Sequence, residues 1–273
     1  MVKIINNLKI LLNGNKCALK YSAGEFTHKN IGDALNVYLF EKVFGKEVES
    51  YKNLLNVGVP QVYSFIGSVL DNTAVRNLVV MGSGFKSATS KVPVVPKKVI
   101  ACRGPLTRKK LMDHQLEVPE VYGDPAILLP FFYNPEVTKK YRIGFIPHYS
   151  EMDLEIVKYW KEKPDVKYID VFSKMEDFIQ DIKSCDFTIS SSLHGVILSH
   201  AYGVPSGWIK LSDTLVGGSF KFDDYFNSLN TSFKPMSLER SSKIVDLQPQ
   251  TTLPETNSLA ENLLETFNSA KVF

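Results

Sequence analysis

The sequence predicts an α/β protein with two Rossmann-like, doubly wound domains that face each other across a cleft. Short apolar runs that suit buried parallel strands alternate with helical patterns. This alternation occurs twice, before and after a break near residue 135. Polar and charged residues directly follow the predicted strands, where open α/β sheets bind ligands. We therefore divide the chain of 273 residues into an N-terminal domain, 1–135, and a C-terminal domain, 136–273.

The first half contains four predicted strands, at 16–22, 62–66, 78–81 and 98–102. Apolar residues at 34–44 indicate a helix that Gly45 ends, with Asp33 as a natural N-cap. The sequence equally permits Asn30, Gly32 and Asp33 to line the cleft at the end of a strand. A second helix is expected to begin near Pro105, since proline is favoured in the first helical turn.

The second half repeats the same alternation after a linking segment at 131–140. Strands are predicted at 142–147, 166–172, 187–189 and 206–211, and helices at 152–161, 176–183, 193–202 and from 220 onward. Residues 258–270 have the apolar spacing of an amphipathic helix. This last helix could pack back on the N-terminal half.

The stretch from Asp186 to Pro205 carries most of the functional argument. A short buried strand, three serines and an apolar helix follow one another, and Gly203 with Pro205 ends the helix. His194 falls in the first turn of that helix, beside backbone N–H groups that have no helical partner and attract anions. The imidazole is therefore either a packing or capping residue, or an acid–base group for a phosphate- or carboxylate-bearing substrate.

Other candidate residues follow further strands and could converge on the same cleft. Arg103 lies between a strand and a helix, where its forked guanidinium suits a carboxylate or phosphate. His148 is either a cleft residue or a loop histidine bonded to the backbone. The candidate catalytic residues are His194, Arg103 and Asp33. The candidate binding residues are Asn30, Gly82, Ser83, Gly84, His148, Ser190, Ser191, Ser192, Gly195, Lys210 and Lys221.

The composition narrows the class of protein. A net charge of +3 without a dense basic run gives no indication of nucleic acid binding. Cys17, Cys102 and Cys185 lie far apart and form no CxxC pattern, which suits free thiols in a reducing compartment. No stretch approaches the roughly 20 apolar residues of a membrane-spanning helix. We expect a cytoplasmic protein without metal or cofactor, and peripheral contact with the inner face of the membrane stays open.

Six short motifs occur in order along the chain. They are Asn30-x-Gly-Asp33, Gly82-x-Gly84, Arg103-Gly-Pro-x-Thr107, Gly123-Asp-Pro125, Ile146-Pro-His-Tyr149, and Ser191-Ser-Leu-His-Gly195 followed by Ala201-Tyr-Gly-Val-Pro205. Together, over about residues 16–230, they resemble the polysaccharide pyruvyl transferase family. The segment Phe220-Lys-Phe-Asp-Asp-Tyr225 is similar to the branch that acts on bacterial exopolysaccharide and capsule subunits.

The resemblance implies a fold similar to GT-B glycosyltransferases and a ketal pyruvyl transfer. Phosphoenolpyruvate would donate its pyruvyl group to two hydroxyls of a sugar in a polysaccharide repeat unit, and a cyclic ketal would form. The resemblance makes His194 the general acid that protonates the methylene carbon of the donor. It makes Arg103 a clamp for the donor's carboxylate or phosphate, and the Ser190–Ser192 turn a phosphate cradle. The implied partners are phosphoenolpyruvate and a sugar acceptor, whether lipid-linked or free.

One position departs from the family's pattern. Many relatives carry Arg immediately before Leu-His-Gly, where this chain has Ser192. The cation that is missing there would contact donor or acceptor. Lys210, Lys221 or His148 could take its place.

Two functions of other classes stay open at this point. A GT-B-type glycosyltransferase would use a nucleotide sugar, and Asp213 and Asp223 are candidate nucleotide-binding carboxylates by their position. A non-catalytic paralogue that binds a glycan or anion is the other, and Ser192 motivates it. A resemblance in fold alone does not separate these functions.

Overall fold

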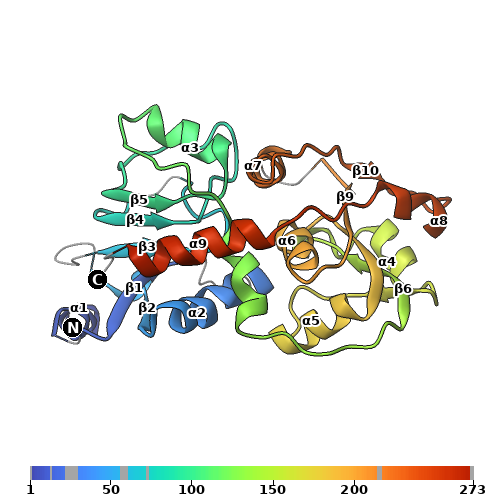
Figure 1. Cartoon of the computed structure of the whole chain (residues 1–273), viewed down its shortest axis with the longest axis horizontal. Coiled ribbons are helices and arrows are strands. Elements are labelled where there is room, and N and C mark those ends of the chain that lie inside the picture. The colour runs from blue at the N-terminus through green and yellow to red at the C-terminus, as the bar shows by residue number, and fades with distance from the viewer. Residues whose placement is uncertain are drawn as a thin grey trace.

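The computed structural model describes residues 2–12, 14–21, 30–55, 61–71, 74–213 and 217–270. Within these ranges each half of the chain forms a sheet of five parallel strands with helices packed against it (Figure 1). The predicted α/β class with two Rossmann-like units is confirmed.

The elements of each half follow one another with short connections. The first half contains α1 (Val2–Leu12), β1 (Lys16–Lys20), α2 (Ile31–Phe44), β2 (Glu47–Ser50), β3 (Val62–Ser64), β4 (Leu78–Met81), β5 (Lys98–Ala101) and α3 (Pro105–Met112), with 3₁₀ turns at Tyr51–Asn53 and Pro125–Phe131. The second half contains β6 (Tyr141–Ile146), α4 (Glu155–Lys161), β7 (Val166–Tyr168), α5 (Met175–Lys183), β8 (Cys185–Ser190), α6 (Leu193–Ala201), β9 (Ser206–Lys210), α7 (Phe220–Ser228), β10 (Met236–Ser237), α8 (Ile244–Leu247) and α9 (Asn257–Ser269), with 3₁₀ turns at Tyr149–Glu151 and Gln248–Gln250.

The two sheets have the same strand order. The first runs β2-β1-β3-β4-β5, and the second, read from β7, runs β7-β6-β8-β9-β10. In both, the chain adds strands first on one side of the opening strand and then on the other. The strand order therefore reverses between β1 and β3 and between β6 and β8. Ligands of doubly wound sheets bind beyond the carboxyl ends of the strands at such a point.

Two helix starts differ from the sequence-based prediction. Helix α2 begins at Ile31, and its N-cap is Asn30, whose side-chain oxygen accepts a hydrogen bond from Gly32 N–H at 3.1 Å. The N-cap prediction for Asp33 is therefore wrong: burial of Ile31 in the core extends the helix by one turn and leaves Asp33 within its first turn. The helix predicted at 152–161 begins at Glu155, after the 3₁₀ turn Tyr149–Glu151.

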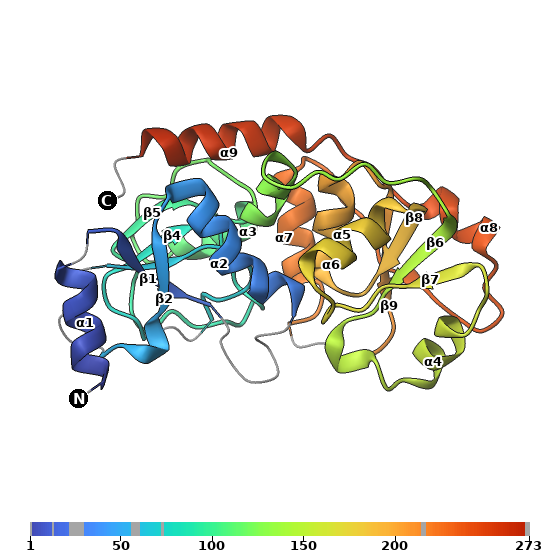
Figure 2. The same ribbon diagram turned by 90° about the horizontal axis from the view of Figure 1, so that it is seen from below.

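A continuous apolar core joins the two halves. It contains Leu19 and Phe65 of the first half together with Phe178 and Ile197 of the second. Helix α9 runs from the second half back across the first (Figure 2), where its Phe267 packs on Phe65 with ring centroids 5.7 Å apart. The carboxyl ends of the two sheets are thereby held facing each other.

Candidate functional site

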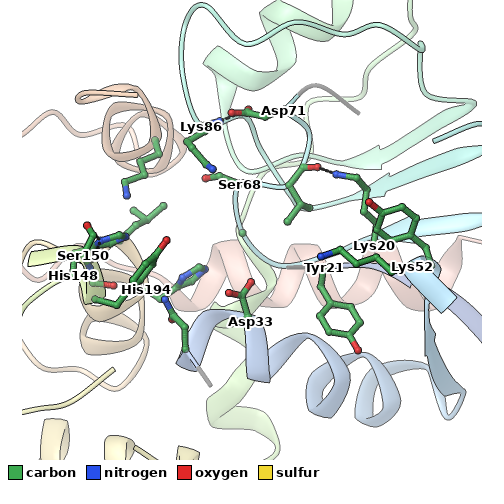
Figure 3. Close-up of a pocket in the computed structure, with 18 residues that line it drawn as sticks. Lys20, Tyr21, Asp33, Lys52, Ser68, Asp71, Lys86, His148, Ser150 and His194 are labelled. Carbon is green, nitrogen blue, oxygen red and sulfur yellow. Dashed lines mark hydrogen bonds between the residues drawn. The ribbon is translucent and has the colours of Figure 1, made fainter. Parts of the chain in front are cut away.

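A cavity of about 430 Å³ lies where the two switch points face each other. Its described wall takes residues after β1, β3, β6 and β8 and from the start of α2, so both halves contribute (Figure 3). The lining residues are Lys20, Tyr21, Asn30, Asp33, Tyr51, Lys52, Gly67, Ser68, Val69, Asp71, Lys86, His148, Tyr149, Ser150, Ser192, Leu193, His194 and Lys221. The position is the one that the sheet topology dictates for a ligand site.

The imidazole of His194 belongs to the second half but packs into the first. A Cβ atom at Gly32 would lie 2.1 Å from its Nδ1, so only glycine leaves room for the ring at that position of α2. Gly67, with φ +92°, lies on another side of the ring, and a Cβ there would be 3.6 Å from Cε1. The first half thus forms a fitted seat for His194.

Asp124 stands behind His194. Its Oδ2 atom lies 3.6 Å from His194 Nε2 and accepts a hydrogen bond from Gly67 N–H at 3.1 Å. Its Oδ1 atom accepts from Ala126 N–H at 3.1 Å, which caps the 3₁₀ turn that follows. The carboxylate is fully buried and fixed on both oxygens, and His194 Nε2 is a buried nitrogen without a hydrogen-bond partner among the described residues. A carboxylate in this position can orient the ring of a neighbouring imidazole.

The wall of the cavity is rich in lysine. Lys20, Lys52, Lys86 and Lys221 all line it, against the carboxylates of Asp33 and Asp71. Burial lowers the pKa of Lys221 to about 8, and the neighbouring charges of Arg103 and Lys86 act in the same direction. Burial also lowers the pKa of Lys20 to about 8, against the opposing effect of Asp71. Crowded cations of this kind gain stability when an anion enters the cavity.

His148 lies on the same side of the cavity as His194, on the loop after β6 (Figure 3). Its Nδ1 atom is 2.8 Å from Ser150 Oγ, and its backbone N–H donates to Ser191 Oγ at 2.9 Å. Burial lowers the pKa of His148 to about 3, and the charges of Lys221, His194 and Lys86 add to this effect. The ring is therefore neutral near pH 7 and can exchange hydrogen bonds without adding a charge.

Comparison with known proteins identifies the family. A family model described as polysaccharide pyruvyl transferase matches residues 30–213, more than half of the chain. The chain belongs to the polysaccharide pyruvyl transferase family. The succinoglycan biosynthesis protein ExoV of Rhizobium meliloti (strain 1021) is 31% identical over 228 residues, which are 80% of this chain and 67% of that protein. The uncharacterized protein L143 of Acanthamoeba polyphaga mimivirus is 29% identical over 208 residues, 72% of this chain and 70% of that protein.

Six of the site residues predicted from the sequence line the cavity. They are Asn30, Asp33, His148, Ser192, His194 and Lys221. Of the three residues that could replace a cation at Ser192, Lys221 and His148 line the cavity, whereas Lys210 is exposed and pairs with Asp213 at 2.5 Å. Lys210 is not among the described residues of the cavity wall.

Arg103 lies behind the wall instead of in it. The side chain is fully buried, and its three nitrogens donate to Asp224 Oδ2 at 3.0 Å, Ser68 Oγ at 2.7 Å and the Phe85 carbonyl at 2.6 Å. Of these partners, Ser68 lines the cavity. The hydrogen bond to Ser68 therefore connects the Arg103 guanidinium to the cavity wall.

The remaining candidates support the turns around the cavity. Gly84 makes room for the Arg103 guanidinium, and Gly195 makes room for Ser190 Oγ. Ser190 Oγ accepts from Ser192 N–H at 3.0 Å and donates to backbone carbonyls, and Ser191 Oγ accepts from His148 N–H. Gly82, Ser83, Gly84, Ser190, Ser191 and Gly195 are absent from the described cavity wall.

Sequence reasoning assigned no role to several residues of the site. Asp124 is the clearest case, although the Gly123-Asp-Pro125 motif that contains it was visible in the sequence. Lys20, Lys52 and Lys86 are scattered lysines whose gathering depends on tertiary structure. Among the described residues, no group of three or more His, Cys, Asp or Glu side chains could hold a metal ion, and no helix is long and apolar enough to cross a membrane.

Proposed function

We propose that this chain transfers a pyruvyl group from phosphoenolpyruvate to two hydroxyls of a sugar in an exopolysaccharide or capsule repeat unit, with formation of a cyclic ketal. The observation that carries the proposal is the His194–Asp124 pair in a lysine-rich cavity at the meeting point of two switch points. Family membership and the relative named for succinoglycan biosynthesis support it.

The charges of the cavity suit this donor. Phosphoenolpyruvate carries a carboxylate and a phosphate. The charges of Lys221 and Lys86 both lower the pKa of His148, and that of Lys86 also lowers the pKa of Lys221. A bound anion relieves the repulsion within this group. The first-turn N–H groups of α6 at Leu193 and His194 add a positive helix end on the same side.

Acid–base catalysis by side chains of this chain can account for every proton in the reaction. With its Nε2–H directed at Asp124, His194 delivers a proton from Nδ1 to the methylene carbon of the donor, and an oxocarbenium-like centre develops at C2. One sugar hydroxyl adds to C2, the C–O bond to phosphate breaks, and the second hydroxyl closes the ketal. The two hydroxyls lose two protons, of which one replaces the proton given to the methylene carbon and the other leaves with phosphate.

Two further residues have roles in this scheme. Asp33, half-buried in the cavity wall, is the base that receives a proton from an attacking hydroxyl. Arg103 acts as part of the donor site through Ser68, to which it donates a hydrogen bond. In this scheme the sugar acceptor binds at the end of the cavity near Tyr21 and Tyr51, because aromatic rings pack well against the apolar faces of sugars.

The test is the release of phosphate from phosphoenolpyruvate with a panel of galactose-, glucose- and mannose-containing acceptors, free and lipid-linked. The wild-type chain should release phosphate only with a matching acceptor. His194→Ala should lower kcat by about a hundredfold or more, as expected for loss of a general acid. Asp124→Asn should lower kcat in the same direction, and the double variant should be no slower than His194→Ala, because the pair acts as a unit.

His114→Ala is the matched control, since His114 is an exposed histidine outside the cavity. Its turnover should equal that of the wild type. Thermal shift with phosphoenolpyruvate and with nucleotide sugars runs in parallel, because a ligand that binds the folded chain raises its Tm. Stabilisation by a nucleotide sugar and not by phosphoenolpyruvate would replace the proposal with a glycosyltransferase, and activity that survives in His194→Ala would remove the acid.

A further inference from the structure

A buried carboxylate of the second half is inserted into the first half. Asp224, on α7, is fully buried, and its Oδ2 atom accepts hydrogen bonds from Arg103 Nε at 3.0 Å and from Thr107 Oγ1 at 2.6 Å. Its Oδ1 atom accepts from Thr107 N–H at 2.9 Å. Gly104, at the N-cap position of α3, has no side chain to offer, so Asp224 caps this helix from the other half.

The segment Arg103-Gly-Pro-x-Thr107 forms the receptor for this carboxylate. A Cβ atom at Gly104 would lie 1.9 Å from the Asp224 carbonyl oxygen, so the glycine permits α7 to approach α3. Figure 1 shows the two helices facing each other across the boundary between the halves. Arg103 and Thr107 then supply the hydrogen-bond donors. The contact with Asp224 therefore explains the arginine, glycine and threonine of the motif.

The segments on both sides of this contact, around Arg103 and on α7, also contribute to the cavity wall. Arg103 donates with Nη1 to Ser68 and with Nη2 to the Phe85 carbonyl, next to Lys86. Ser68 and Lys86 line the cavity. On α7, Lys221 precedes Asp224 by three residues and lies on the same helical face, and it also lines the cavity. One carboxylate therefore connects cavity residues on three separate segments.

We propose that Asp224 is a positioning residue for the cationic wall of the donor site, acting on Ser68 and the loop before Lys86 through Arg103 and on Lys221 through α7. The proposal rests on the proposed function in so far as the wall receives phosphoenolpyruvate. Breaking the contact displaces α7 and the two loops, and the cations no longer converge on one anion. A buried charge pair that has lost one partner is also strongly destabilising, so position and stability must be measured separately.

The experiment compares Asp224→Asn with Thr107→Val and Asp223→Asn. Thr107→Val removes the hydroxyl that donates to Asp224 and accepts from Phe85 N–H at 3.3 Å, but it leaves the pair with Arg103, so it destabilises the same contact without releasing the charge. Asp223→Asn is the control on the same helix, at a half-buried neighbour. Two quantities are measured in addition to Tm. They are the Kd for phosphoenolpyruvate, by calorimetry, and the rate at which an amine-reactive reagent modifies Lys221 at pH 8, by peptide mass spectrometry.

Asp224→Asn should raise the Kd for phosphoenolpyruvate and the modification rate of Lys221 by about tenfold each, the effect of losing one buried charged contact. Both quantities should stay near wild type in Asp223→Asn and in Thr107→Val, although Thr107→Val lowers Tm. If both quantities instead follow Tm across the variants, Asp224 has a structural role alone and the proposal is overturned.

The modification of Lys221 needs no substrate, so it tests the positioning even if wild-type protein fails to bind phosphoenolpyruvate, a result that would count against the proposed function. Arg103→Lys is tested instead if Asp224→Asn does not fold. This variant keeps a cation for Asp224 but gives up the bonds to Ser68 and Phe85. It should weaken phosphoenolpyruvate binding and leave Lys221 modification unchanged, whereas unchanged binding would refute the connection through Arg103.

Discussion

The two halves of this molecule have the same strand order but contribute different chemistry to the cavity. The second half brings the two imidazoles, His148 on the loop after β6 and His194 in the first turn of α6. The first half brings Asp33, the lysines at the end of β1 and after β2 and β4, and the glycines that make room for His194. Equivalent topological positions thus carry His194, the proposed acid, on one side and its seat on the other.

Neither half therefore holds a complete site. His194 Nε2 faces Asp124 and the face of its ring lies against Gly32, and both of these residues precede the link between the halves. In return, α7 of the second half caps α3 of the first and brings Lys221 into the wall. The contact between the halves therefore forms the site as well as the core, and substitutions on one side should disable groups on the other.

The largest effect is expected from Gly32→Ala. The new methyl group would lie 2.1 Å from His194 Nδ1, so the ring must leave its seat. Loss of the positioned acid should lower kcat by about a hundredfold or more, close to the effect of His194→Ala itself. Acceptor-dependent phosphate release measures this effect, and circular dichroism with a thermal melt verifies the fold.

Gly14→Ala is the matched control in the same half, because a Cβ atom at Gly14 meets nothing within 4 Å. It should leave kcat at the wild-type value. A fully active Gly32→Ala variant would show that the first half does not seat the imidazole, and the proposed division of roles between the halves would fail.

A smaller effect is expected from the pH dependence of donor binding. The pKa of Lys221 is lowered to about 8 by burial, so its ammonium form is present below that pH and is lost above it. The affinity for phosphoenolpyruvate should fall by about tenfold between pH 7 and pH 9 as this cation and Lys20 lose their protons. Lys221→Met should bind more weakly at pH 7 and show a flatter profile in calorimetric titrations.

Lys163→Met is the corresponding control. Lys163 also belongs to the second half, but it lies over the ring of Trp160, away from the described cavity wall. Its pH profile should match the wild type. If Lys221→Met keeps the wild-type profile, Lys221 does not take part in anion binding.

The smallest effect concerns stability in acid. Burial lowers the pKa of His148 to about 3, below the ordinary value of 6.5, so the unfolded chain binds more protons between these values. The contribution of His148 to stability is therefore complete above about pH 6.5 and is lost as the pH falls towards 3. His148→Asn, which keeps a capping side chain for the following turn, should reduce the loss of Tm between pH 7 and pH 5 by about a few degrees.

His114→Asn, at an exposed position, should leave the acid-induced change in Tm as it is in the wild type. An equal change in His148→Asn and wild-type protein would mean that neither burial nor the neighbouring cations lower the pKa of this imidazole.

The sequence predicted the elements that local patterns govern. Apolar runs predicted β4 at its observed bounds, and serine, glycine and proline signals predicted α6 to within one residue. The starts of α2 and α4 were wrong by three residues each, because burial of Ile31 and the 3₁₀ turn at Tyr149–Glu151 depend on tertiary packing. The two-residue strand β10 is too short to leave a pattern.

The site was predictable where chemistry follows a strand and unpredictable where distant residues meet. His194, His148 and Asn30 line the cavity as expected. The position after a strand also suggested Arg103, but it could not reveal that Asp224, 121 residues later, occupies the guanidinium. The pairing of Asp124 with His194 likewise depends on the docking of the two halves, which no local pattern encodes.

A structure of the chain with phosphoenolpyruvate bound, determined with Asp33→Asn to slow turnover, would show whether His194 reaches the donor. We expect the donor in the cavity between the two switch points, its phosphate beside Lys86 and Lys221 and its methylene carbon facing His194. A donor bound outside this cavity, or in it with the methylene carbon turned away from His194, would show that His194 is not an acid held in place by the first half.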